Sequence, residues 1–175
     1  MRFLFENELI RFRAMEPTDV ELLYFWENDP EHWSSGSTLQ PLSKSAMEAY
    51  VEESHKSLYE LGAMRLMIEG VRERRAIGAV DLYDYDAYNR RVAVGLLIET
   101  SYRGRGFGSS AIKMISDYAL CHLRLRLVYA HIDRQNKPSQ AAFISAGFRE
   151  VASLPLWHWN GEEYSDLLVY TKSAD

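Results

Sequence analysis

The chain has 175 residues, 47% of them hydrophobic, and a formal net charge of −5 at pH 7. That length suits one folded unit, so we expect a single domain spanning residues 1–175. The hydrophobic fraction and the four tryptophans exclude an intrinsically disordered protein. The acidic balance argues against nucleic acid as a partner and is compatible with a cationic substrate.

The sequence predicts a cytoplasmic protein without a membrane partner. Met1-Arg2 leads into mixed charge, so we expect no secretory signal peptide. No uninterrupted apolar run has the length that crossing a bilayer requires. Cys121 is the single cysteine, so no internal disulfide can form. It lies on the apolar stripe of a predicted helix, and we expect it to be buried.

Hydrophobic periodicity predicts alternating strands and helices in the first half of the chain. Thr18 and Glu21 have the spacing of a capping box, which predicts a helix start. Asn28-Asp29-Pro30 predicts the end of that helix. The expected elements are a strand at 9–13, a helix from 18 to about 27, a polar and aromatic loop at 31–41, a helix at 43–61, and a hairpin with strands at 64–69 and 76–85.

The second half contains the most informative pattern. An apolar, β-branched strand at 92–98 leads into Tyr102-Arg103-Gly104-Arg105-Gly106-Phe107-Gly108-Ser109 and then into an amphipathic helix at 109–120. The remaining expected elements are a strand at 127–132, a helix at 139–146 ended by Gly147, and strands at 149–154 and 166–171 joined by a loop with Trp157, His158 and Trp159. A strand, helix and strand in succession predict a parallel pair, so we expect one mixed α/β sheet.

The glycine-rich segment has the features of a pyrophosphate seat. Three glycines at alternate positions allow positive φ and close approach of the backbone to a ligand. The helix start that follows offers unpaired N–H donors and a partial positive charge, and Arg103 and Arg105 add two cations. The alternative is a glycine-rich turn that binds no ligand and carries charged side chains at the surface. The spacing differs from the dinucleotide-binding fingerprint, and the Gly-Lys-Ser/Thr of nucleotide hydrolases is missing.

Two motifs together resemble one known superfamily. Arg103-x-x-Gly106-x-Gly108 is similar to the acetyl-CoA pyrophosphate loop of the GNAT N-acetyltransferases, and Asn136 to Phe148 resembles their N-x-x-S/A-x-x-x-Y/F-x-x-x-G-F block. The resemblance extends from Leu9 to Tyr170 and is greatest to the branch with bacterial spermidine N-acetyltransferases and ribosomal-protein N-terminal acetyltransferases. It implies the acyl-CoA N-acyltransferase fold, in which one mixed, mainly antiparallel sheet has a splayed parallel central pair and helices on both faces.

The resemblance also implies the activity and the cosubstrate. It predicts an enzyme that uses acetyl-CoA to acetylate a primary amine by direct attack, with the pantetheine arm between the splayed strands. Asn136 would hold that arm or, alternatively, cap the helix that follows it. The residues implied for acetyl-CoA are Leu96, Leu97, Ile98, Arg103, Gly104, Arg105, Gly106, Phe107, Gly108, Ser109, Asn136, Ser139 and Phe143. We expect no metal, because the five histidines are scattered.

Direct attack needs a neutral amine and therefore a proton acceptor. Primary amines have a pKa near ~10, so losing the proton near pH 7 costs about 4 kcal/mol. Glu99 and Asp81 are the catalytic candidates for this role, with surface carboxylates as the alternative reading. Glu99 ends the central strand, where ligands gather in open α/β sheets. Asp84, beyond Asp81 on its strand, is expected to face the opposite side.

Phe143 occupies a position where many GNAT members have a tyrosine that protonates the departing thiolate. Phenylalanine has no proton to donate, although a thiolate is a fair leaving group with a pKa near ~8.5. Ser139, Tyr129 and His131 are the remaining donors nearby, and Ser139 is our catalytic candidate among them. His131 lies on a predicted buried strand, so we expect a core histidine there.

Aromatic side chains are expected on the acceptor side, by analogy with the superfamily. The predicted substrate-binding residues are Trp33, Asp84, Trp157 and Trp159, since aromatic rings attract ammonium groups. Spermidine acetyltransferases have acidic residues in the loop that corresponds to Trp33-Ser34-Ser35-Gly36, whereas this chain has serines and glycine. We therefore expect a peptide N-terminus or a small-molecule amine as acceptor. A polyamine acceptor and a non-catalytic acyl-CoA-binding module are the alternatives, and a homodimer is left open.

Overall fold

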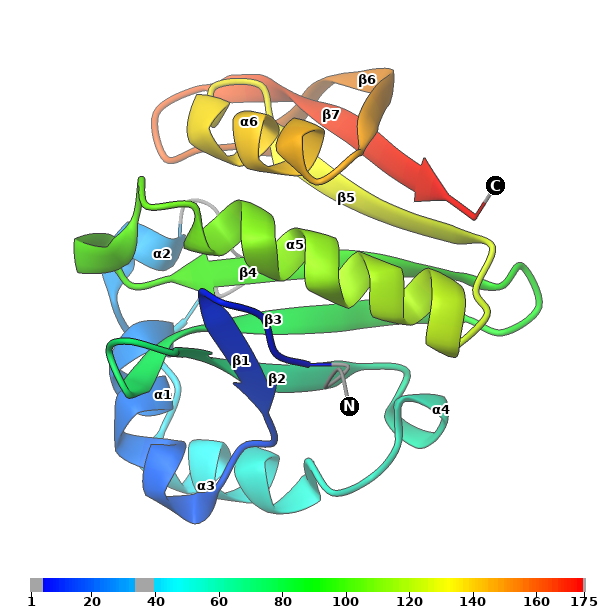
Figure 1. Cartoon of the computed structure of the whole chain (residues 1–175). Coiled ribbons are helices and arrows are strands. Elements are labelled where there is room, and N and C mark those ends of the chain that lie inside the picture. The colour runs from blue at the N-terminus through cyan, green and yellow to red at the C-terminus, as the bar shows by residue number, and fades with distance from the viewer. Residues whose placement is uncertain (1–4, 34–39, 175) are drawn as a thin grey trace.

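The computed structural model describes residues 5–33 and 40–174, and these form a seven-stranded mixed sheet with helices on both faces (Figure 1). The strand order is β1-β2-β3-β4-β5-β7-β6. The strands are β1 (Ile10–Arg13), β2 (Met64–Gly70), β3 (Arg75–Asp86), β4 (Arg91–Ile98), β5 (Leu127–Asp133), β6 (Arg149–Trp159) and β7 (Tyr164–Ser173). The helices are α1 (Val20–Glu27), α2 (Pro30–Trp33), α3 (Lys44–Glu53), α4 (Leu58–Leu61), α5 (Phe107–Asp117) and α6 (Lys137–Ser145).

The parallel pair at the centre of the sheet is short. β4 and β5 pair only between residues 91–93 and 127–129, whereas the other neighbouring strands are antiparallel. Beyond that point β4 stays paired with β3 as far as Ile98, and β5 stays paired with β7 as far as Asp133. The two strands therefore separate after Ala93, which confirms the splayed pair expected from the sequence.

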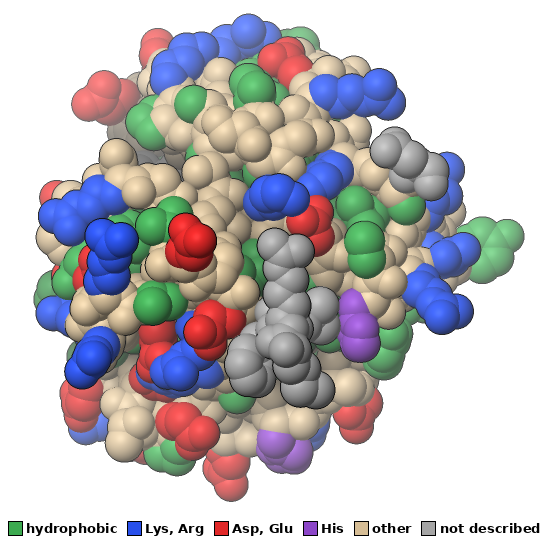
Figure 2. All heavy atoms as spheres, in the orientation of Figure 1, with side chains coloured by type: hydrophobic (Ala, Val, Ile, Leu, Met, Phe, Trp, Pro, Cys, Tyr) green, Lys and Arg blue, Asp and Glu red, His purple; other side chains and the backbone are tan. Residues whose placement is uncertain are grey.

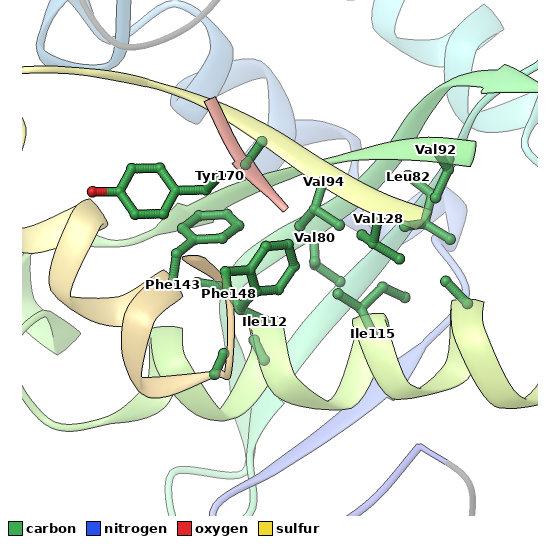
Figure 3. Packing of buried hydrophobic residues seen from close by; sticks show 14 of the residues in the cluster. Val80, Leu82, Val92, Val94, Ile112, Ile115, Val128, Phe143, Phe148 and Tyr170 are labelled. Carbon is green, nitrogen blue, oxygen red and sulfur yellow. The ribbon is translucent and has the colours of Figure 1, made fainter. Parts of the chain in front are cut away.

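Alternating apolar side chains give the sheet a core on each face. On one face, residues of β3, β4 and β5 pack against Ile112 and Ile115 of α5 (Figure 3). On the other face, Met67 and Ala79 pack against α1 and α3, where Trp26 is only 1% exposed. The open part of the β4–β5 gap thus lies between two well-packed halves, which hold its walls in place.

The helix predicted at 43–61 is divided into α3 and α4. Ser43 caps α3 by accepting a hydrogen bond from the Ala46 N–H at 3.1 Å. Ser54 ends it, because its hydroxyl donates to the Val51 carbonyl at 2.6 Å. Ser57 then caps α4, where its own N–H donates to the Glu60 carboxylate at 2.8 Å. Serine hydroxyls compete with the helix backbone in this way, and the apolar periodicity did not reveal it.

The capping box predicted from Thr18 and Glu21 lies two residues earlier. Glu16 caps a 3₁₀ turn at Pro17–Asp19, and its N–H donates to the Asp19 carboxylate at 2.8 Å. α1 continues from that turn. Asp19 takes this place because it is buried and also binds Arg13, a partner from β1 that the local pattern did not include.

Two other expectations are corrected in the second half of the chain. Trp157, His158 and Trp159 belong to β6, which is longer than predicted, and not to a loop. Cys121 is exposed. It lies in a π-helical turn, Tyr118–His122, in which the Leu123 N–H donates to the Tyr118 carbonyl. The wider turn rotates the apolar stripe, so the 3.6-residue period no longer places Cys121 inward.

The surface of the face seen in Figure 2 carries mixed charge. Acidic and basic side chains are interspersed over it without a large patch of one sign. Among the described residues, none of the helices combines the length and apolar character that a membrane crossing requires.

Candidate active site

A cleft of about 960 Å³ lies where β4 and β5 separate. Residues 94–98 of β4 and 130–133 of β5 form its two walls. One end reaches the glycine-rich loop and the start of α5, and the other reaches α1, α2 and β2. The cleft therefore joins a predicted phosphate seat to a second polar region on the opposite face of the sheet.

The glycine-rich loop reverses the chain between β4 and α5. Gly104 and Gly106 have φ of +74° and +83°, and a Cβ on either would meet no atom within 4 Å. Their requirement for glycine is thus the backbone conformation itself. Gly108 differs, because its Cβ would stand 3.2 Å from Leu96 Cδ2, so its lack of a side chain lets α5 approach β4. Arg103 fastens the loop by donating from Nε to the Ile98 carbonyl at 3.0 Å.

The N-terminus of α5 faces the open end of the cleft. Gly106 is the residue before the helix, and it has no side chain with which to cap it. The first bond of the helix runs from the Ser110 N–H to the Gly106 carbonyl at 3.1 Å. The preceding helical N–H groups have no carbonyl one turn earlier within the helix, so they are the donors available to an anion. Gly106, Gly108 and Ser109 line the cleft, whereas Phe107 is buried in the core.

The α6 side of the cleft contains Asn136, Ser139 and Phe143. Asn136 caps α6, because its Oδ1 accepts from the Ser139 N–H at 3.2 Å. The other end of that carboxamide, Nδ2, is a donor, so the cap leaves Asn136 able to bind a second group. Phe143 is 3% exposed, and its ring meets Phe148 edge-on at 5.0 Å.

At the end of the cleft near α1 and β2, Arg65 binds two carboxylates. Arg65 Nε and Nη2 donate to the two Asp81 oxygens at 2.6 and 3.0 Å, and Nη1 donates to Glu27. The Tyr50 ring lies 5.6 Å from the guanidinium carbon. Burial alone would lower the pKa of Arg65, but the charge and hydrogen bonds of Asp81 outweigh it and raise that pKa. Two carboxylates are thus fixed beside one cation in the wall of the cleft.

Several polar cleft residues were not singled out from the sequence. Glu27, Glu31, Asp133 and His158 line the cleft together with His131. His131 is exposed to the cleft and is not the core residue that was expected. The prediction failed because His131 alternates with the buried Ala130 and Ile132 and so points to the other face of β5, which borders the cleft. Asp133 accepts hydrogen bonds from Ser165 Oγ and from the Gln135 N–H, the latter at 2.7 Å.

Other predicted site residues lie outside the described lining of the cleft. Glu99 instead accepts from Ser101 Oγ at 3.1 Å and pairs with Arg75 at 3.3 Å. Asp84 is exposed at an irregularity in β3 and has a φ of +50°.

The predicted aromatic residues and Arg105 are also not placed in the cleft. Trp157 and Trp159 are 66% and 53% exposed on β6. Arg105 is exposed, with its guanidinium carbon 5.5 Å from the Tyr102 ring centre. Trp33 ends α2, and its side chain and residues 34–39 lie outside the described part of the structure.

This combination of a splayed parallel pair, a glycine loop and a free helix start agrees with a family comparison. The Acetyltransferase (GNAT) domain family matches residues 10–149. The chain belongs to the GNAT acetyltransferase family. It is therefore an enzyme of the N-acetyltransferase class with the GNAT fold.

Relatives of this GNAT chain include acetyltransferases with different acceptors. The spermidine N(1)-acetyltransferase of Escherichia coli strain K12 is 24% identical over 142 residues, which are 79% of this chain and 72% of that protein. The spermidine N-acetyltransferase of Vibrio cholerae in complex with CoA and spermine superposes with a TM-score of 0.83 at 21% identity, over 95% of this chain and 96% of that one. RimL, a ribosomal L7/L12 α-N-protein acetyltransferase in complex with CoA, has a TM-score of 0.84 at 15% identity, over 97% and 96%. At these identities the structures share the fold.

Proposed function

We propose that this GNAT enzyme binds acetyl-CoA along the β4 edge of the cleft and transfers its acetyl group to a primary amine. The amine belongs to a peptide N-terminus or to a small molecule. The observation that carries the proposal is the separation of β4 from β5 directly beside the free start of α5. The unpaired backbone edge of β4 can hold the extended pantetheine arm of CoA. The N–H groups at the start of α5 can bind its pyrophosphate.

The chain's own residues fit CoA at three points. The N–H donors at the start of α5 face the pyrophosphate, with Arg103 at the same end of the cleft. Leu96, Leu97 and Ile98 have β3 on one side only, so their other backbone edge is left to the pantetheine arm. Asn136 caps α6 with its oxygen and offers its Nδ2 donor to the same arm.

Asp81 is the carboxylate that we place beside the attacking amine. It lines the cleft directly opposite Gly95, and Arg65 fixes both of its oxygens. In this position it attracts the incoming ammonium and orients the nitrogen, and water in the cleft carries the released proton away. Ser139 contacts the pantetheine arm from the α6 side. Glu99 and Asp84 have no part in this proposal, because neither belongs to the described lining of the cleft.

A polyamine is the second candidate acceptor, and one observation favours it. Among the residues that the structure describes, four carboxylates line the cleft, those of Glu27, Glu31, Asp81 and Asp133, against the cations Arg65 and Arg103. Carboxylates spaced along a groove can hold more than one ammonium group. Arg65 neutralises part of this charge, however, since it binds both Glu27 and Asp81. For this reason we keep a single primary amine as the first choice.

The test is thiol release from acetyl-CoA with a matched panel of acceptors. Spermidine, simple monoamines and short peptides with free N-termini are compared at equal concentration, with N-terminally blocked peptides as controls. Turnover with a peptide or monoamine supports the proposal. A much higher kcat/KM for spermidine selects the polyamine alternative. Tight CoA binding without turnover across the panel would refute the proposed acceptor class.

Two aspartates on β3 provide a matched pair for the acceptor side. We expect Asp81→Asn to lower kcat/KM for the amine by about tenfold or more, which corresponds to about 1.4 kcal/mol in transition-state binding. The affinity for CoA, measured by calorimetry, should stay unchanged. Asp84→Asn should have little effect, because Asp84 is exposed and outside the described cleft lining. Equal kcat/KM values for the two variants would show that Asp81 has no role in binding the amine.

A further inference from the structure

The α6 side of the cleft offers little that could protonate a departing thiolate. Phe143 has no donor atom, and the Ser139 hydroxyl is an aliphatic alcohol, which is a weaker acid than a phenol. The β3 side is different, because Tyr83 lines the cleft there with a phenol group. Among the described residues, no hydrogen-bond partner of the Tyr83 hydroxyl is found. The phenol is thus a donor in the cleft that the proposed reaction has not used.

Tyr83 is placed at the point where the central strands part. It lies opposite Ala93, the last β4 residue that pairs with β5. Two residues further along β4, Gly95 lies opposite Asp81. A Cβ on Gly95 would stand 3.4 Å from Tyr83 Cε1 and 3.6 Å from Asp81 Oδ2. Because Gly95 has no side chain, the phenol ring and the carboxylate flank the same bare stretch of backbone.

The direction of the cleft brings the reacting end of the cosubstrate to this stretch. The glycine loop adjoins β4 at Ile98, and from there the strand runs about 10 Å back to Gly95, at roughly 3.3 Å per residue. An arm that leaves the pyrophosphate seat and follows this edge takes its thioester toward Gly95. Tyr83 is therefore near the sulfur end of the arm rather than its phosphate end.

The Tyr83 hydroxyl carries its proton at neutral pH. Burial is the main cause that raises the pKa of Tyr83 to about 12, followed by the charges of Asp84, Tyr129 and Asp81. At neutral pH the group is a phenol and can donate a hydrogen bond. A thiolate formed next to it would be the acceptor that such a donor lacks in the described structure.

We propose that, in the amine acetylation put forward above and resting on it, Tyr83 donates its hydroxyl proton to the departing CoA sulfur. Water carries away the proton of the incoming ammonium. The neutral amine nitrogen then attacks the thioester carbonyl carbon, so a C–N bond forms and the C–S bond breaks with its electron pair on sulfur. Tyr83 gives its proton to that sulfur and in the same step takes up the second proton, which the acylated nitrogen releases beside Asp81. In total one proton moves from nitrogen to sulfur, and Tyr83 is regenerated.

The experiment compares Tyr83→Phe with Tyr85→Phe. Tyr85 is on the same strand and packs edge-on against Tyr59 at 5.4 Å, outside the described cleft lining. Each variant is assayed with acetyl-CoA and with the analogue that has selenium in place of sulfur. A selenolate leaves without protonation far more easily than a thiolate, so it does not need an acid. Ser139→Ala is measured in parallel, and calorimetry gives the affinity of each variant for CoA.

We expect Tyr83→Phe to lower kcat with acetyl-CoA by about tenfold to a hundredfold, the lower part of the range for general acid catalysis. Its kcat with the selenium analogue and its affinity for CoA should match those of the unsubstituted enzyme. Equal kcat values with acetyl-CoA, an equal loss with both cosubstrates, or a loss confined to Ser139→Ala would each overturn the proposal. An unsubstituted enzyme that acetylates no amine would instead refute the proposed function, so the two failures are distinguishable.

Discussion

Glycine has distinct physical roles within a few residues of the loop that precedes α5. Gly104 and Gly106 supply the left-handed backbone conformation, and around both the protein leaves open space. Gly108 has an ordinary φ, but a Cβ there would come within 3.2 Å of Leu96. The same residue type is thus required by the turn at two positions and by helix packing at the third. Both open spaces border the cleft, and the one at Gly106 lies directly before α5.

Gly106→Val should therefore abolish most CoA binding. A branched side chain would fill the open space at the start of α5, and we expect the affinity to fall by more than about tenfold, or about 1.4 kcal/mol. Calorimetric titration with CoA measures this. Gly62→Val is the control, because Gly62 has a φ of +70° and open surroundings, away from the loop. It carries similar backbone strain and should bind CoA normally. A folded Gly106→Val protein with unchanged affinity would refute the assignment of the loop.

The alternation of buried and exposed side chains along a strand explains which of its residues reach the cleft. On β5, Val128, Ala130 and Ile132 are buried, whereas His131 is exposed and Asp133 is half-buried at the cleft. This alternation is visible in the sequence and could have identified Asp133. His158 gave no comparable signal, because β6 is mostly exposed and has no apolar alternation. Its place in the cleft depends on the order of β5, β7 and β6 in the sheet.

A buried ion-pair network connects β1 to the turn before α1. Arg13 donates to both Asp19 oxygens at 2.6 and 2.8 Å and also pairs with Glu69 of β2. Burial alone would raise the pKa of Asp19, but the hydrogen bonds from Arg13 and from the Glu16 N–H outweigh it and lower that pKa. The network therefore stabilises the folded state only while Asp19 is ionised.

Asp19→Asn should reduce stability at neutral pH by about 1.5–3 kcal/mol, the range for hydrogen bonds to charged groups. Because the folded-state pKa is lowered, the stabilisation is fully present above the ordinary value near ~3.9 and is lost as pH falls through the folded value. The two proteins should thus converge in urea melts below about pH 4. Glu21→Gln, which removes only an exposed ion pair with Lys44, should leave stability nearly unchanged. A pH-independent difference for Asp19→Asn would contradict this account.

At the scale of the whole molecule, the two sides of the cleft differ in how far the sequence could predict them. The strand, the glycine loop and α5 follow one another along the chain, so local patterns were sufficient to predict this strand, loop and helix. The acceptor side collects Glu27, Asp81, Asp133 and His158 from four separate elements. Their proximity results from sheet order and from the splay of β4 and β5, which no local period encodes. Arg65 was missed for the same reason, since its two partners are 16 and 38 residues away.

The parting of β4 and β5 has a consequence for the energetics of the empty enzyme. The sheet is complete on either side of the gap but joined across it by only three residue pairs. The N–H groups that face the gap exchange with solvent unless a ligand occupies it. We expect acetyl-CoA to pair with β4 as an added strand, so that its binding is coupled to how tightly the two halves of the sheet hold together.

Saturating CoA should consequently slow amide hydrogen exchange at residues 95–98 more than at residues 67–70 of β2, which already pair with β1 and β3. At a free concentration one hundred times the Kd, the linked stabilisation is about 2.7 kcal/mol. For a chain of this size that corresponds to a rise in Tm of roughly 5–10 °C. Protection confined to the glycine loop, with residues 95–98 unchanged, would mean that the arm does not pair with β4. The gap would then be a passage through the sheet and not a place for an added strand.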